Sequence, residues 1–202
     1  MSFPDFFDLA PQITMYDPLS EFLGASEGGL ITYGYADAVK LAGHSCPTVA
    51  GTWLMLARGL ERLYPNSPPE RGMIRVAFPS PANSGVTGVM AAVATLLTGA
   101  TQDSGFKGLG GRFDRRGLLD FSQSFDGVMA MERCDDRARV ILTLDTSVLP
   151  ADPDMGRLMG LCLSGQGNKE DQKRFADIWQ NRVRHMLTQL ANDTRLVRLT
   201  SS

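Results

Sequence analysis

The hydrophobic positions of residues 49–64 repeat with a helical period. Apolar side chains recur every three or four residues, which places them on one helix face, with Arg58 and Arg62 on the opposite face. The apolar positions are Val49, Trp53, Leu56, Leu60, Leu63 and Tyr64. The sequence PNSPP that follows cannot continue a helix. The pattern therefore predicts an amphipathic helix that starts near Pro47 and covers a core.

Strand patterns occur on both sides of the middle of the chain. The stretch LITY, residues 30–33, predicts a strand, and apolar residues alternate with others at Ile74, Val76 and Phe78. Residues 127–145 predict two strands that turn at Asp135 and Asp136. We expect these last two strands to pair as an antiparallel hairpin.

Four further helices are expected. Residues 36–43 predict a short helix that ends near Gly43, and residues 85–99 predict a helix rich in small residues, capped by Ser84 and stopped by Gly99. Its small side chains suit close packing against a sheet or against a second copy of itself. Two helices, at residues 154–163 and 170–190, are expected to close the chain, and the tail RLVRLTSS to be a frayed end.

The loose alternation of helices and strands favours an α+β fold over a doubly wound α/β sheet. We expect a single core domain with a mixed or antiparallel sheet packed by helices. Residues 1–150 would form this core with an N-terminal arm. Residues 151–202 would form a C-terminal helical segment packed on it.

Composition narrows the range of partners. The chain has 202 residues, 43% of them hydrophobic, and a net charge of −2, so we expect neither nucleic acid nor a membrane as a partner. Three scattered cysteines do not make a disulfide framework, which favours a reducing compartment. The N-terminus lacks the basic and apolar regions of a signal peptide. We therefore expect a cytoplasmic protein.

The sequence GHSCP, residues 43–47, combines one of the two histidines with one of the three cysteines. Pro47 suits the first position of a helix, which makes Cys46 the residue that caps it. A helix N-terminus favours the thiolate, the form that ligates metals and attacks electrophiles. His44 lies two residues earlier, so both side chains can reach one ion. A structural turn with a packed cysteine is the alternative for so short a motif.

The sequence DSGFKGLGGRFDRRG, residues 103–117, combines five glycines with four cations. Lys107 and Arg112 are its candidate ligand-binding residues, because glycine-rich backbone and nearby cations suit phosphate or carboxylate. A flexible loop with solvated charges is the alternative. The loop lacks the spacing of a Walker A motif and the strand–loop–helix context of a dinucleotide fingerprint. No nucleotide cofactor is expected.

The motif AGHSCPTVAG, followed about fifty residues later by LLTGATQDSGFKG, resembles the FmdE-like family, which is named after a component of formylmethanofuran dehydrogenase. The resemblance covers roughly residues 33–120. It implies an α+β core, a homodimer, and a metal or redox site at the GHSCP turn, with His44 and Cys46 as the metal-binding pair and Lys107 as the loop lysine. The chain departs from the family at Ala100, where members often have cysteine, and it has no C-x-x-C motif for a second metal site.

Three functions are compatible with these features. The first is an FmdE-like metal-binding protein, with zinc held by His44 and Cys46, an open ligand position, and an anion-binding loop around Lys107 and Arg112 for a small anionic ligand. The second is a metal-free reactive-thiol or redox protein that uses Cys46. The third is a non-catalytic accessory subunit, with the helix near residues 86–97 as a dimer interface. We favour the first.

Overall fold

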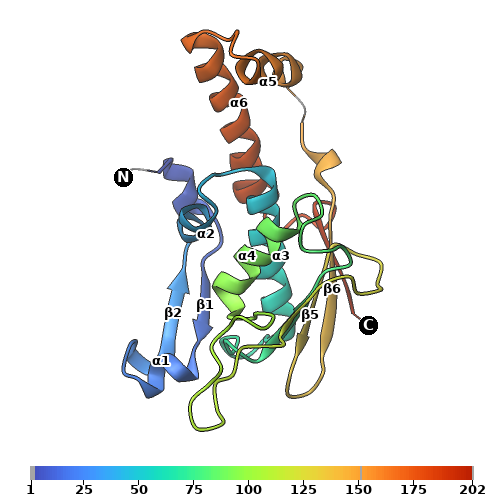
Figure 1. The fold of residues 1–202 in the computed structure, drawn as a ribbon. Helices are drawn as coiled ribbons and strands as arrows, with labels where there is room; N and C mark the ends of the chain where they lie inside the picture. Colours follow the sequence, from blue (N-terminus) through green and yellow to red (C-terminus); the bar gives the residue numbers. More distant parts are fainter. Residues whose placement is uncertain (1–2, 151, 202) are drawn as a thin grey trace.

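The computed structural model describes residues 3–150 and 152–201. It has a mixed α+β fold, as the sequence predicted (Figure 1). The α-helices are α1 (Pro18–Phe22), α2 (Tyr35–Ala42), α3 (Pro47–Leu63), α4 (Thr87–Thr98), α5 (Met155–Leu163) and α6 (Lys169–Thr188). The strands are β1 (Ile13–Tyr16), β2 (Leu30–Tyr33), β3 (Ile74–Ala77), β4 (Leu119–Asp120), β5 (Met129–Arg133), β6 (Arg139–Leu144) and β7 (Val197–Ser201). Short 3-10 helices are η1 (Asp5–Leu9), η2 (Glu27–Gly29) and η3 (Thr146–Val148).

The main sheet is mixed and has the strand order β4-β3-β5-β6-β7. Strands β3 and β4 pair in parallel, and the other neighbours are antiparallel. The predicted hairpin of β5 and β6 is present, with Met131 opposite Val140. Strands β1 and β2 form a separate antiparallel pair near the N-terminus.

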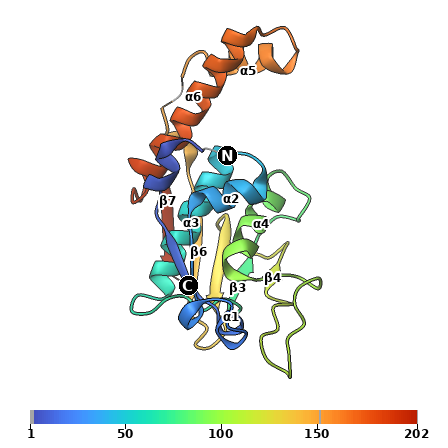
Figure 2. The ribbon, with the colours of Figure 1, turned by 90° about the vertical axis from the view of Figure 1, so that its left-hand side faces the viewer.

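Helix α3 is the centre of the core of this single domain. It contacts β5, β6, α4 and α6, and its apolar face is fully buried from Val49 to Leu56 (Figures 1 and 2). Alternate residues of β3, β5 and β6 point into the same core, as the alternating pattern requires. The helix stops at Leu63, shortly before the PNSPP sequence.

Helix α4 begins later than its sequence suggested. Its N-cap is Val86, with no side-chain cap, so the expectation that Ser84 caps the helix was wrong. Instead the Ser84 carbonyl accepts a hydrogen bond from the Thr87 amide at 3.0 Å, which closes a turn before the helix. The helix ends at Gly99 with φ +72°, the expected left-handed stop.

The C-terminal part of the chain is only partly helical. The tail predicted to fray forms β7, which pairs with β6 from Val197 to Ser201 at the edge of the main sheet. Leu196 and Val197 are fully buried, which explains why this end is ordered. Helix α6 packs its last turns on α3 and η1, whereas α5 and the first half of α6 extend away from the rest of the molecule (Figures 1 and 2). The segment 151–202 therefore divides between this extension and the core.

Candidate functional site

The GHSCP turn joins helices α2 and α3. Helix α2 ends at Ala42, and Gly43 takes the left-handed conformation, φ +75°, with its amide bonded to the Val39 carbonyl at 2.8 Å. Cys46 is the N-cap of α3 and Pro47 is the first helical residue, as the sequence predicted. The Cys46 Sγ accepts a hydrogen bond from the Val49 amide at 3.5 Å. The thiol therefore lies at the positive end of a 17-residue helix.

The imidazole of His44 is exposed, and its orientation is set by the backbone. Its Nδ1 lies 2.9 Å from the Ala42 carbonyl, which can only accept, so Nδ1 carries the proton and donates. In this tautomer Nε2 keeps its lone pair. A backbone carbonyl behind Nδ1 is the arrangement that orients metal-binding histidines in many proteins.

Ser45, between the two candidate ligands, is held by helix α6. Its carbonyl accepts hydrogen bonds from Trp179 Nε1 at 3.0 Å and from Gln180 Nε2 at 3.2 Å. Its hydroxyl lies 3.0 Å from the hydroxyl of Tyr35, which is fully buried, and burial raises the pKa of that tyrosine. The turn is thus fixed from two sides. A helix over residues 170–190, packed on the core, was predicted, but nothing in the sequence indicated that the Trp179 indole would donate to this turn.

The described residues supply no third donor at the turn. Among them, no group of three or more His, Cys, Asp and Glu side chains could hold a metal ion. Cys134 follows strand β5, Cys162 lies in α5, and His185 lies on α6 beside Arg182. His44 and Cys46 would therefore be two ligands of an incomplete shell.

The structure does not bring the second predicted site to the first. The loop of residues 99–117 lies at the C-terminal end of α4, whereas the GHSCP turn lies at the opposite end of the helical layer (Figures 1 and 2). Lys107 and Arg112 are both exposed on this loop, and the Arg112 guanidinium lies 4.7 Å from the centre of the Phe113 ring. Arg116 is paired with Asp114 at 2.7 Å.

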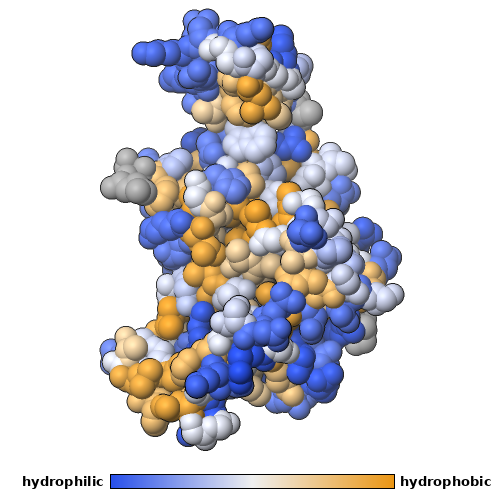
Figure 3. All heavy atoms as spheres, viewed as in Figure 1, coloured by the Kyte–Doolittle hydropathy of each residue, from blue (hydrophilic) through white to orange (hydrophobic). Residues whose placement is uncertain are grey.

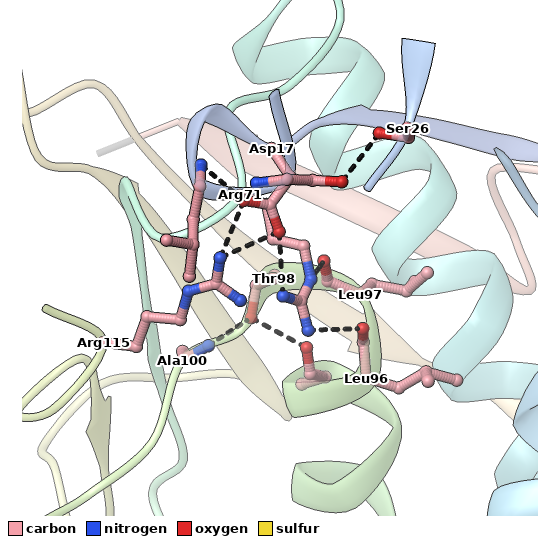
Figure 4. A network of polar contacts seen from close by, with 11 residues as sticks. Asp17, Ser26, Arg71, Leu96, Leu97, Thr98, Ala100 and Arg115 are labelled. Atoms are coloured by element: carbon pink, nitrogen blue, oxygen red, sulfur yellow. Dashed lines mark hydrogen bonds and ion pairs between the residues drawn. The ribbon is translucent and has the colours of Figure 1, made fainter. Parts of the chain in front are cut away.

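Arg115, the fourth cation of that loop, belongs to a buried ionic network centred on Asp17 (Figure 4). Its Nη2 donates to both Asp17 oxygens, at 2.7 and 2.8 Å. Arg71 donates to the same carboxylate at 3.1 Å and to the carbonyls of Leu96 and Leu97 at the end of α4. Asp17 is only 3% exposed. The network therefore connects α1, the residues before β3 and the glycine-rich loop, and it uses Arg115 for structure.

Burial raises the pKa of Asp17, but hydrogen bonds from Arg115, from the Ser20 amide and from Arg71 lower it by more. The net result is a carboxyl whose pKa lies below its usual range, ionised throughout the neutral region. No sequence signal marks this group, because Arg71 and Arg115 lie 54 and 98 residues from Asp17.

No protein-family model matches the chain, and no curated protein shows significant similarity to it. None of the helices in the described residues combines the length and apolar character that crossing a bilayer requires.

Proposed function

We propose that this chain binds a divalent metal ion, zinc, at the GHSCP turn, with His44 Nε2 and Cys46 Sγ as two ligands. The observation that carries the proposal is the pairing of a free histidine nitrogen with a helix-capping thiol on one short turn. The Ala42 carbonyl fixes the tautomer of His44, and Cys46 Sγ lies at the N-terminus of α3, where it accepts a hydrogen bond from the Val49 amide.

Nitrogen and sulfur donors together suit zinc better than magnesium or calcium, which prefer oxygen. Because the described residues offer only these two donors at the turn, a water, an external ligand or a second copy of the chain would complete the shell. An incomplete shell of this kind leaves a position at which a ligand can bind the metal. The resemblance of the motif to the FmdE-like family supports the same assignment.

Zinc stoichiometry tests the proposal. The chain is freed of metal with a chelator, equilibrated with zinc, separated by gel filtration and measured by elemental analysis. We expect about one zinc per chain in the wild type, the same amount in Cys162→Ser, and none in His44→Ala combined with Cys46→Ser. A wild type without zinc, or a double variant that keeps it, would falsify the proposal.

A reactive thiol is the second candidate, and one observation favours it. Cys46 caps a helix, whereas burial raises the pKa of Cys134. Alkylation by iodoacetamide at pH 7, followed residue by residue with mass spectrometry, separates the two candidates. Under the zinc proposal, zinc protects Cys46 and leaves the rate at Cys134 unchanged. Under the thiol candidate, Cys46 reacts faster than Cys134 whether or not zinc is present.

Anion binding by Lys107 and Arg112 stays a separate prediction for the other end of the molecule.

Helix α4 supports a further prediction, self-association. Its sequence, TGVMAAVATLLT, contains no charged residue, and the molecular surface over this helix is largely apolar (Figure 3). An accessory subunit and a metal-binding protein can both use such a face to form a homodimer.

A further inference from the structure

Helices α3 and α4 direct their N-termini at one pocket. The pocket has a volume of about 470 Å³ and lies beside the GHSCP turn. Residues at the start of both helices line it, Pro47 and Thr48 from α3, and Thr87 with the N-cap residue Val86 from α4. It is distinct from the glycine-rich loop, which lies at the other end of α4.

The N-terminus of α4 is uncapped. Its N-cap residue is Val86, whose side chain cannot accept a hydrogen bond, and its first turn contains no acidic residue. The amides of Gly88 and Val89 have no acceptor among the described residues. Helices usually satisfy these first amides with a Ser, Thr, Asp or Asn side chain. Two donors of α4 are therefore left for another acceptor.

The N-terminus of α3 is only weakly capped. Its cap is the Cys46 thiol, a weak acceptor, 3.5 Å from the Val49 amide. Within the described residues the Thr48 amide has no acceptor. Both helices exceed eight residues, with 17 in α3 and 12 in α4. Each end therefore carries about half a positive charge, directed at the same space.

A hydroxyl in the lining of the pocket points to the same ligand. Thr87 is only 4% exposed and lines the pocket, yet its hydroxyl has no hydrogen-bond partner among the described residues. Because this hydroxyl has no partner in the described protein, it can donate to a ligand that enters the pocket. Three further hydroxyl residues, Ser80, Ser84 and Thr146, line the pocket with Thr48 and Thr87.

The rest of the lining is apolar and uncharged. Met90, Val128 and Leu144 line the pocket with Val86, and the lining contains no acidic or basic side chain. An anion there meets no carboxylate that would repel it. The volume exceeds that of a small inorganic anion and falls within the range of small-molecule sites.

We propose that this pocket binds a small organic anion, with a phosphate or carboxylate group at the two helix N-termini and an apolar body against Met90 and Leu144. Free amides at a helix end are a common phosphate site in proteins, and two converging ends strengthen the attraction. The Thr87 hydroxyl donates the side-chain hydrogen bond. The proposal does not depend on zinc at the GHSCP turn, so either one can fail without the other.

Amide NMR on the full-length chain, recorded with a chelator present, tests the proposal. Inorganic phosphate, phenyl phosphate and acetate are titrated separately, with sodium chloride at equal ionic strength as the blank. We expect the amides of Thr48, Gly88 and Val89 to shift along one saturable curve. Phenyl phosphate should half-saturate at a concentration about tenfold below that of inorganic phosphate, since its ring adds apolar contact. Saturation by acetate alone would assign a carboxylate ligand instead of a phosphate.

Val86→Asp separates binding from folding. A carboxylate at the N-cap takes the free amides of α4 and repels an anion, while Asp is a better cap than Val. This variant should lose the saturable shifts without a lower melting temperature. Ser104→Asp, which adds the same charge on the exposed glycine-rich loop, should keep them.

Thr87 gives a second and finer comparison. Thr87→Val should weaken binding about tenfold, as expected for losing one hydrogen bond to a charged group, whereas Thr87→Ser should retain it. Three outcomes would overturn the proposal. They are the absence of saturation with every probe, unchanged binding in Val86→Asp, and saturable shifts confined to the amides near Lys107 and Arg112.

Discussion

At the scale of single residues, Asp17 is a buried carboxylate that compensates the charges of two arginines. Asp17→Asn leaves Arg71 and Arg115 in place with their charges uncompensated, while their side chains are only 17% and 12% exposed. Breaking a buried pair in this way costs about 3 kcal/mol of unfolding free energy. Urea denaturation at pH 7 measures the loss.

The pH dependence of this loss has a definite sign. Because the folded pKa of Asp17 is lowered, its stabilising contribution is complete above its unfolded pKa, about 3.9, and disappears as the pH falls through the folded value. The difference in unfolding free energy between the wild type and Asp17→Asn should therefore become smaller from pH 5 to pH 3. Urea denaturation at each pH measures it. Asp135→Asn in the exposed β5–β6 turn is the control, with a much smaller effect at pH 7. Equal effects of the two substitutions would contradict the assignment.

The sequence predicted the structural role of some residues but not of others. The role of Cys46 as a cap was predictable, since Pro47 marks the first turn of a helix by local backbone geometry alone. The role of Arg115 was not, because a glycine-rich loop with cations looks the same whether its arginines face solvent or a distant aspartate. Only the folded structure brings Asp17 into contact with Arg115. Local rules thus determined the turn, and long-range contacts determined the loop.

At the scale of elements, the contact of α3 with the sheet depends on a missing side chain. A Cβ added at Gly59 would lie 2.7 Å from Met131 Sδ and 3.3 Å from Leu142 Cδ1, and both of these side chains are fully buried. We expect Gly59→Ala to destabilise the protein by about 1–2 kcal/mol, since overpacking outweighs the gain in helix propensity. Thermal or urea denaturation measures this change.

Gly160 in α5 gives the matched control. It also lies within a helix, but an added Cβ there would meet no atom within 4 Å. Gly160→Ala should therefore stabilise the protein, by about 0.5–1 kcal/mol at most. If Gly59→Ala were as stabilising as Gly160→Ala, the close approach of α3 to β5 and β6 would be incorrect.

Element prediction failed where tertiary pairing overrode local signals. The tail RLVRLTSS is short and terminal, and its residues show no regular alternation of apolar and polar side chains that would indicate a strand. Its pairing with β6 and the hydrogen bonds from Arg58 to the carbonyls of Asp193 and Val197 order it. The start of α4 failed for a different, local reason, because a turn closed by the Ser84 carbonyl and the Thr87 amide replaced the expected cap.

At the scale of the whole molecule, the α+β class followed from the order of helical and strand patterns, and the mixed sheet is one of the two arrangements that were expected. The relative position of the two candidate sites did not. They lie at opposite ends of the helical layer, and the order of the motifs along the chain did not indicate this separation (Figure 1). The pocket between α3 and α4 shows the converse, since Thr48 and Thr87 come together without any shared motif.

Self-association is a prediction of the same scale. On the outer side of helix α4, Ala92 is exposed, and Val89 and Leu96 are partly buried against the core. Sedimentation at several concentrations should show a dimer that Ala92→Arg shifts to monomer. Ala176→Arg, the same change on the exposed part of α6, should leave the dimer intact. A wild type that stays monomeric at every concentration would remove this face as an interface.

The most direct measurement of the central claim is the absorption spectrum of the protein after cobalt(II) replaces zinc. A thiolate bound to cobalt gives an intense charge-transfer band in the near ultraviolet, which reports the metal–sulfur bond itself. We predict this band in the wild type and in Cys162→Ser, and its absence in Cys46→Ser. A wild type without the band, or a Cys46→Ser variant that keeps it, would show that the GHSCP turn does not hold the metal.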